Sequence, residues 1–510
     1  MQAFLQRIAP DTVLGRLLAK APTFVIAVTC IILIAFSVIK IARQTMTPYP
    51  IDMWEAAAIT VAARVANGEP MYRSMNEPDG IEPGLYSPLQ PLALAVVFRF
   101  AGPSLVAARA INLLTGVAFI ALFAYALRLH REPLLLLFGV AVLLMIDRQM
   151  TGLWDLPRAD AVPLLCALAF IAAAYRACTT DRMSWMVIAH VILLIGLFWK
   201  QTILAVAPAP FLASLFTPNC SKRMRAACFL GPILLVATTV LAVAALSPNL
   251  FETMFRVGGR YSISMRLLGI YAYAFLLFTP LLWMGIWAVL FGPASHIIAD
   301  LKWRWAMITV IAAAPLNFLA AAKIGGGPNS LAHCLYGMAA ATLCCAPTMF
   351  ALLRAAGPIA PIRNACLGIA IALALGIEWT TVFHTPSRVK LHRPYGDPGR
   401  PAVIEFARGL PGKVVSPQDP TLALAAKGYA GATAAYEWDR QLWKWPLPKV
   451  IRELETADYV ITWGQTNTWQ TWTFDEGIRL LPQLGFKPIP VPGLTNSSYA
   501  IWKRDGAKSP

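Results

Sequence analysis

The chain has 510 residues, of which 58% are hydrophobic and only 14% are charged, and its 43 Lys and Arg against 26 Asp and Glu give a formal net charge of +17. A soluble globular protein carries about 25% charged residues, so the composition excludes that class. In a soluble protein the positive charge would suggest a nucleic-acid partner. In a membrane protein it orients helices by the positive-inside rule, faces anionic lipid and can hold a phosphate, so we expect no nucleic acid.

Apolar runs of spanning length recur from Ala21 to about residue 381, which predicts a polytopic α-helical membrane protein. The first run is itself long enough to span, so no signal peptide is expected. We predict about eleven spans, within a range of roughly 10 to 13. They are expected at residues 22–43, 104–128, 132–147, 160–177, 184–199, 202–217, 226–247, 267–292, 305–322, 332–354 and 364–381.

The charges between these spans predict their orientation. Basic residues cluster in alternate loops, and the positive-inside rule places those loops and the N-terminus in the cytoplasm. The residues concerned are Arg128, Arg131, Arg176, Arg182, Lys222, Arg223, Arg225, Lys302, Arg304, Arg354 and Arg363. The stretch Leu89–Gly102 is too short to cross and contains Arg99, so we expect a helix lying in the outer interface.

The first outer loop, residues 44–103, begins with two acids where a span meets water. Asp52 and Glu55 would share one face if the segment is helical, and a partly desolvated carboxylate is costly and readily tuned by its neighbours. This loop is therefore the first candidate for an active site. The alternative is a carboxylate pair that stabilises the N-terminus of the following helix.

Further polar residues interrupt the apolar runs, and the predicted topology puts them on the same outer face. They are Asp147, Arg148, Asp155, Arg158, Asp160, Lys200, Gln201, Arg260, Tyr261, Arg266, Lys323, Asn329 and His333. This pattern suits a phosphate-bearing lipid headgroup held by basic residues, beside a carboxylate that takes a proton from a hydroxyl. Glycines at 325–327 would let the backbone approach a ligand closely, although a plain turn explains them equally well.

Most of these residues also have a purely structural explanation. An outer-loop salt bridge explains Arg158 with Asp160. The polar tip of a hairpin explains Lys200 with Gln201, and solvated loop charges explain Arg260 with Arg266.

The last part of the chain, residues 385–510, predicts a small α/β domain after the membrane module of residues 1–384. An odd number of spans places it outside the membrane, in the periplasm. Short strands are expected at Val414–Ser416, Asp458–Thr462 and Tyr499–Trp502. Helix-compatible segments lie between them, at Thr421–Lys427 and Lys449–Thr456.

Other motifs limit the chemistry. The nine cysteines all fall in predicted spans or cytoplasmic loops, so no disulfide framework is expected. Cys-x-x-Cys, His-Glu-x-x-His, Walker and dinucleotide-binding motifs are not found, so zinc, ATP and dinucleotide chemistry lack their usual sequence signals.

The order of these elements resembles the GT-C superfamily of membrane glycosyltransferases, and within it the bacterial branch related to protein O-mannosyltransferases and lipid A aminoarabinose transferase, a glycosyltransferase family 39-like group. Asp52-x-x-Glu55 after the first span, Gly68–Tyr72 and the Tyr86-Ser87-Pro88-Leu89 turn carry the resemblance. It extends to Arg109, Arg158-Ala159-Asp160, Lys200-Gln201 and Gly326–Asn329. No basic residue stands directly before Pro88 in this turn. The expected phosphate contact is therefore Arg260, Arg266 or Lys200.

This resemblance implies transfer of one sugar from a polyprenyl-phosphate donor to an envelope glycan, lipid or protein acceptor at the outer side of a bacterial inner membrane. Asp52 is the expected general base, because one carboxylate within reach suffices for an inverting displacement. Glu55 or Asp160 would orient it, raise its basicity, or share a divalent cation such as Mg or Mn with it. Tyr86 is expected at the substrate, and the leaving lipid phosphate needs neutralisation by Arg and Lys.

Two other classes remain open. A secondary transporter or lipid flippase would also carry charges at the membrane face, but it should show internal repeats and interrupted helices near the bilayer midplane, and no convincing repeat is found. An O-antigen ligase or polymerase would place basic residues outside without needing the early Asp-x-x-Glu loop. A scaffold that binds without turnover is the non-catalytic alternative.

Overall fold

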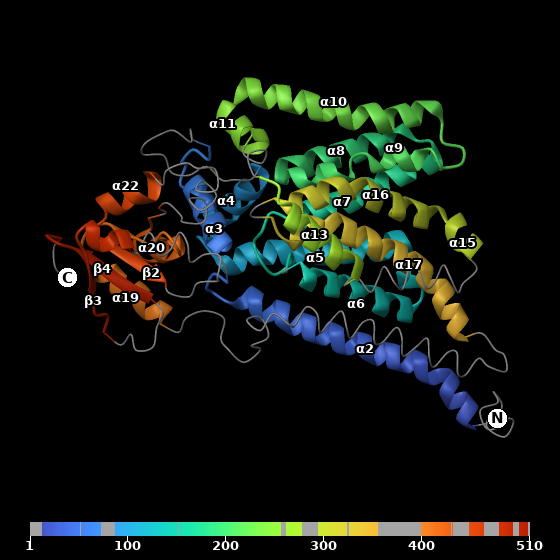
Figure 1. Cartoon of the computed structure of the whole chain (residues 1–510), viewed down its shortest axis with the longest axis horizontal. Helices are drawn as coiled ribbons and strands as arrows, with labels where there is room; N and C mark the ends of the chain where they lie inside the picture. Colours follow the sequence, from blue (N-terminus) through green and yellow to red (C-terminus); the bar gives the residue numbers. More distant parts are fainter. Residues whose placement is uncertain are drawn as a thin grey trace.

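The structure is a computed structural model, and it describes residues 13–51, 53–72, 87–150, 152–256, 262–277, 294–323, 326–354, 399–429, 431, 448–463, 479–492 and 499–507. Figure 1 shows a bundle of long helices with a smaller unit of helices and strands at one end. We call residues 399–507 the C-terminal unit.

Six described helical stretches are long and apolar enough to cross a membrane. They are Lys20–Met46 within α2 (Val13–Met46), α5 (Leu105–Leu127), α7 (Ala161–Thr180), α10 (Lys222–Leu246), α16 (Leu301–Ala322), and Pro328–Ala351 within η4 (Pro328–Leu331) and α17 (Ala332–Arg354). Shorter apolar helices are α4 (Leu89–Ala101), α6 (Pro133–Gln149), α8 (Met183–Trp199), and η2 (Gln201–Val206) with α9 (Ala209–Ser214). The predicted class, a helical membrane protein, is confirmed.

The described helices differ from the predicted spans in one place. The predicted span at 202–217 is a 3₁₀ segment, η2, followed by the short helix α9. Pro208 and Pro210 lack the backbone N–H that a continuous helix needs there. Of the predicted span 267–292, α13 (Met265–Leu277) covers the first part, and the remainder and the span 364–381 lie outside the described residues. The count of eleven stays a prediction.

Short elements connect the long helices. The expected interfacial segment is helical, as α4, and it follows α3 (Met53–Ala66) in the first loop. The remaining described connectors are η1 (Leu129–Arg131), α11 (Pro248–Phe251), the π-helical η3 (Glu252–Arg256) and α15 (Ala294–Ala299).

Hydrogen bonds join the loops that were predicted to share the outer face. Ser87 Oγ donates to the carbonyl of Leu197 at 3.0 Å, and Gln90 Nε2 donates to the carbonyl of Pro157 at 2.9 Å. Farther along, Gln201 Nε2 donates to the carbonyl of Met254 at 2.9 Å. An isolated antiparallel bridge pairs residue 263 with residue 323. These loops therefore gather at one end of the bundle.

Trp154 anchors one of these loops in the core of the bundle. Its side chain is 2% exposed, and its ring centroid lies 5.9 Å from that of Phe119 on α5 and 6.1 Å from that of Tyr336 on α17. Gly116 faces the indole so closely that a Cβ there would lie 2.6 Å from Trp154 Cγ. The close approach of α5 to the loop therefore depends on glycine at this position.

The C-terminal unit contains a four-stranded sheet in the order β1-β2-β4-β3. Its strands are β1 (Val414–Val415), β2 (Tyr459–Trp463), β3 (Phe486–Ile489) and β4 (Tyr499–Arg504), and its helices are α19 (Arg400–Gly409), α20 (Pro420–Lys427) and α22 (Pro448–Thr456). Strand β1 pairs with β2 in parallel, and the other pairs are antiparallel. Strands therefore stand at the three predicted places, and β3 is an additional one.

The C-terminal unit contacts the first loop directly. Figure 1 shows α20 beside α3, at the end of the bundle where α2 ends. Leu424 of α20 packs against the apolar cluster that α3, α4 and α5 form with Ile59, Ala62 and Phe98 among its members. The unit is therefore docked on the loop that contains the predicted active site.

Candidate functional site

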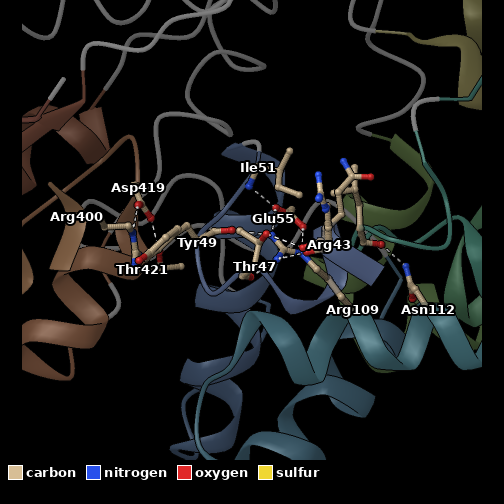
Figure 2. Close-up of polar contacts among 12 residues, drawn as sticks. Arg43, Thr47, Tyr49, Ile51, Glu55, Arg109, Asn112, Arg400, Asp419 and Thr421 are labelled. Atoms are coloured by element: carbon tan, nitrogen blue, oxygen red, sulfur yellow. Dashed lines mark hydrogen bonds and ion pairs between the residues drawn. The ribbon is translucent and has the colours of Figure 1, made fainter. Parts of the chain in front are cut away.

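Arg109, in the first turns of α5, fixes the loop that follows α2. Its Nε and Nη2 donate to the two carboxylate oxygens of Glu55, each at 2.8 Å, and both side chains are fully buried. Its remaining donors reach backbone carbonyls: Gln44 at 2.8 Å, Tyr49 at 2.7 Å, and Thr47. A guanidinium has five N–H donors, and all five are used here. Figure 2 shows this arrangement.

Glu55 is consequently a structural partner as well as a neighbour of the predicted base. Its Oε2 also accepts the backbone N–H of Ile51 at 2.5 Å, so the carboxylate ties the start of α3 to the preceding loop. Both oxygens are engaged by hydrogen-bond donors of the protein. This arrangement suits orientation of the loop better than proton transfer. Asp52 itself lies outside the described residues, between Ile51 and α3.

Asn112, on the same helix α5, fixes the loop after α6. Its Nδ2 lies within hydrogen-bonding distance of the carbonyls of Leu156, Arg158 and Leu153, at 2.5, 2.9 and 3.3 Å. Arg109 and Asn112 are separated by about one helical turn, so they lie on one side of α5. A single helix face therefore positions both acidic loops, one beside Asp52 and the other leading to Asp160.

Asp160, just before α7, pairs with Lys200 at the end of α8. The Lys200 ammonium lies 2.6 Å from Asp160 Oδ1, and the two side chains are 11% and 8% exposed. His333, on the first turn of α17, is also buried; its Nδ1 lies 3.5 Å from Asn317 Nδ2, and its Nε2 has no hydrogen-bond partner among the described residues. Asp160 and Lys200 therefore form a buried polar pair, and His333 is a further buried polar residue at the start of α17.

Asp147 and Asp155, at the end of α6 and in the loop that follows it, form a second acidic group. Asp147 Oδ1 accepts the backbone N–H groups of Leu153 and Trp154 at 2.7 and 3.2 Å, which ends α6 and turns the chain. Asp155 is fully buried, and Lys40 of α2 lies 3.5 Å from its Oδ2. Asp155 is therefore linked to α2 and not to the Lys200 group. Arg158, which lies between Asp155 and Asp160 in the sequence, is half-buried.

The basic residues of the later loops are only partly described. Lys323 ends α16, is half-buried, and has its pKa lowered by burial. Arg266 is exposed on the first turn of α13. Gln201 is used to hold Met254 in η3, the segment that precedes Arg260 and Tyr261. Arg260, Tyr261 and Tyr86 lie, like Asp52, outside the described residues.

The glycine-rich turn after α16 approaches its own backbone. A Cβ on Gly326 would lie 2.4 Å from the carbonyl oxygen of Ala320 and 2.5 Å from that of Ala321. Glycine is therefore needed at 326 for the turn itself, the simpler of the two explanations. Asn329, in η4, is half-buried, and its Oδ1 lies over Gly327.

The predicted cation ligands do not form a metal site within the described part of the chain. No group of three His, Cys, Asp or Glu side chains there could hold a metal ion. Glu55 is bound by Arg109 and Asp160 by Lys200, and Asp52 is not described. We therefore derive no step through a cation.

Several residues that build the site were absent from the sequence-based candidates. They are Asn112, Gln90, Asn317, Lys40 and Arg400. A usable signal existed for two of them, because Asn112 and Asn317 lie inside apolar spans, where a polar side chain generally has a role. The other three lie near segment ends, where polar residues are ordinary.

Comparison with known proteins identifies the fold. A scan against protein-family models finds no match, and neither does a search of curated proteins. Among solved structures, ArnT from Cupriavidus metallidurans bound to undecaprenyl phosphate matches with a TM-score of 0.52 at 12% identity, covering 94% of this chain and 99% of that chain. Its apo structure matches with a TM-score of 0.54 at 13% identity, covering 92% and 97%.

An oligosaccharyltransferase from Archaeoglobus fulgidus gives a TM-score of 0.42 at 11% identity, covering 85% of this chain and 68% of that chain. The chain has the fold of ArnT over nearly its whole length. The expected resemblance is thereby confirmed at the level of the fold.

Proposed function

We propose that this chain transfers a monosaccharide from a polyprenyl-phosphate donor to a hydroxyl of a lipid, glycan or protein acceptor. The fold carries the proposal: the chain matches, over 94% of its length, a structure that contains undecaprenyl phosphate. The buried polar network at one end of the bundle supports it, because such a network is expensive in a membrane protein and marks a functional site by default.

Asp52 is the general base of the proposed reaction. The five hydrogen bonds of Arg109 and the bond from Ile51 to Glu55 hold the segment that leads to it. A base must lie within hydrogen-bonding reach of the acceptor hydroxyl, so a rigid loop keeps the carboxylate oriented without a reorganisation cost during each turnover. The acceptor oxygen attacks the anomeric carbon while Asp52 takes its proton, and the lipid phosphate leaves.

Basic residues neutralise the leaving phosphate. Lys200 is held by Asp160 at the edge of the bundle, and Lys323 lies half-buried at the end of α16. Arg266 lies on the first turn of α13, just after residue 263, which pairs with residue 323, and Arg260 precedes it in the sequence. The charge that develops on the phosphate oxygens is stabilised most by cations that are already in place. Arg109 has no such role, because its five donors are used within the protein.

We further propose that the protein resides in a bacterial inner membrane, with its N-terminus in the cytoplasm and the C-terminal unit in the periplasm. The basic loops at 128–131 and 176–182 lie at the opposite ends of α5 and α7 from Arg109 and Asp160. The positive-inside rule assigns the basic ends to the cytoplasm. Periplasmic acceptor and donor would then meet at the end where the polar loops gather.

The test is turnover by purified protein in nanodiscs, with radiolabelled polyprenyl-phosphate sugars as donors and an envelope lipid and glycan extract as acceptor. We expect Asp52→Asn to lower kcat by about 10²- to 10⁴-fold while donor binding is retained. The matched control is Asp505→Asn, at a carboxylate that is 61% exposed in the C-terminal unit. Transfer undiminished in Asp52→Asn would move the base to Asp160. No transfer from any donor, with lipid movement across vesicles, would identify a flippase.

A further inference from the structure

Arg400 is a buried charge at the start of α19, where the C-terminal unit meets the first loop. Its side chain is 6% exposed. Its Nε lies 3.2 Å from Asp419 Oδ2, and its Nη2 donates to Thr421 Oγ1 at 2.6 Å. Thr421 Oγ1 in turn donates to the other oxygen of Asp419, which is fully buried. The guanidinium is thus held along one edge by two partners from the start of α20.

The guanidinium of Arg400 also lies over the ring of Tyr49. The Cζ atom of Arg400 lies 5.4 Å from the centroid of the Tyr49 ring, within the range of a cation–π contact. The carbonyl of the same tyrosine accepts from Arg109 Nη2 at 2.7 Å. Tyr49 is therefore fixed twice, by its ring from the C-terminal unit and by its backbone from α5, as Figure 2 shows.

We propose that Arg400 is a positioning residue through which the C-terminal unit holds the loop of the candidate base. The loop enters at Thr47, is held at Tyr49 from both sides, and reaches Asp52 directly after Ile51, whose N–H is bound by Glu55. Releasing the ring would leave the loop fixed by backbone bonds only, so that the carboxylate at its end would spend less time in reach of the acceptor. This inference rests on the proposed function.

The chemistry of arginine is specific to this position. A planar guanidinium can bind a carboxylate and a hydroxyl through its edge and still offer its face to an aromatic ring, whereas an ammonium can only approach as a point charge. The buried Asp419 balances the charge, so that Arg400 stays in place without help from solvent. Lysine should therefore replace it only poorly.

Hydrogen exchange on the full-length protein in nanodiscs tests the contact without any substrate. We expect Arg400→Met and Tyr49→Leu to speed exchange in the peptide covering residues 44–51, whereas Tyr49→Phe, which keeps the ring, should match the wild type. The matched control is Arg408→Met, on the same helix, where the arginine is 55% exposed and pairs with Glu405. Wild-type exchange in both Arg400→Met and Tyr49→Leu would overturn the proposal.

Tyr49→Leu also distinguishes loss of the contact from unfolding of the C-terminal unit. Arg400→Met could unfold the C-terminal unit, and the peptide containing β2, residues 459–463, would then exchange faster. Tyr49→Leu leaves the Arg400, Asp419 and Thr421 network intact, so faster exchange at 44–51 with an unchanged β2 peptide would support the proposal. Faster exchange at β2 alone would contradict it.

Turnover with the polyprenyl-phosphate sugars shows whether the loop acts on chemistry. We expect Arg400→Met to lower kcat by about 2- to 30-fold, the range of one cation–π contact, with the donor KM unchanged. Combining it with Tyr49→Leu should add nothing, because both remove the same contact. Additive losses, or a loss confined to KM, would overturn the positioning role. Absence of transfer in the wild type would refute the proposed function, and hydrogen exchange would still decide whether Arg400 holds the loop.

Discussion

Two buried ion pairs lie at the same end of the helix bundle, and they differ in how completely the protein encloses them. Arg109 and Glu55 are both fully buried, and every N–H of the guanidinium is spent on the carboxylate or on carbonyls of one loop. Lys200 and Asp160 are 11% and 8% exposed, and the ammonium pairs with one carboxylate oxygen at 2.6 Å. The first pair is closed to solvent and holds the chain together, whereas the second keeps part of each side chain accessible.

This comparison predicts the largest effect for Arg109→Met. Removing one member of a buried pair leaves an uncompensated charge, which costs about 3 to 5 kcal/mol of unfolding free energy. Thermal unfolding of the purified protein in detergent should show it as a large fall in Tm. Glu55→Gln should cost a similar amount, because it leaves the buried Arg109 charge uncompensated and turns an amide N–H towards a guanidinium donor.

The matched control for Arg109→Met is Arg256→Met, since Arg256 is 65% exposed and pairs with Glu252 within one helix. An exposed pair of this kind contributes about 0 to 1 kcal/mol, so its Tm should barely change. If Arg109→Met kept the wild-type Tm and lost affinity for undecaprenyl phosphate, Arg109 would belong to the ligand site and the comparison of the two pairs would fail.

For the Lys200–Asp160 pair, the quantity to measure is the affinity for undecaprenyl phosphate. The double variant Lys200→Met with Asp160→Asn removes both charges, so no uncompensated ion remains. We expect it to lower the affinity for undecaprenyl phosphate by about 10- to 100-fold, the value of a hydrogen bond to a charged group, with a smaller fall in Tm than Arg109→Met. Lys487→Met, at a lysine that is 74% exposed in the C-terminal unit, is the control. Unchanged affinity in the double variant would remove Lys200 from the proposed phosphate site.

The contrast between the pairs also shows what sequence alone can give. Apolar runs and loop charges predicted the helical membrane class and the grouping of the outer loops, because both depend on local composition. They also indicated Glu55 and Asp160 as notable acids. They did not reveal that both oxygens of Glu55 are bound by Arg109, because Arg109 lies on a helix distant in the sequence. The remaining acceptors of the guanidinium are backbone carbonyls, which every sequence has.

The same limit applies to Asn112 and Arg400. The acceptors of Asn112 are backbone carbonyls of the loop at 153–158, and the guanidinium of Arg400 contacts a tyrosine in another part of the chain. Such contacts depend on tertiary packing. The break in the predicted span at 202–217 is different, because Pro208 and Pro210 were visible in the sequence and were outweighed by its apolar character.

The smallest predicted effect tests whether Lys323 takes part in phosphate binding beside Lys200. Burial lowers the pKa of Lys323, so this side chain loses its proton, and with it its attraction for a phosphate, at a lower pH than an exposed lysine. Undecaprenyl phosphate affinity should therefore decline as pH rises through that lowered pKa, and it should be fully present below it.

Lys323→Arg, whose guanidinium stays protonated, should keep the affinity to higher pH. Lys487→Arg, at an exposed site, should leave the profile unchanged. An identical pH profile in wild type and Lys323→Arg would show that Lys323 contributes no charge to the bound phosphate, and would leave Lys200 and the arginines of the loop at 260–266 as its partners.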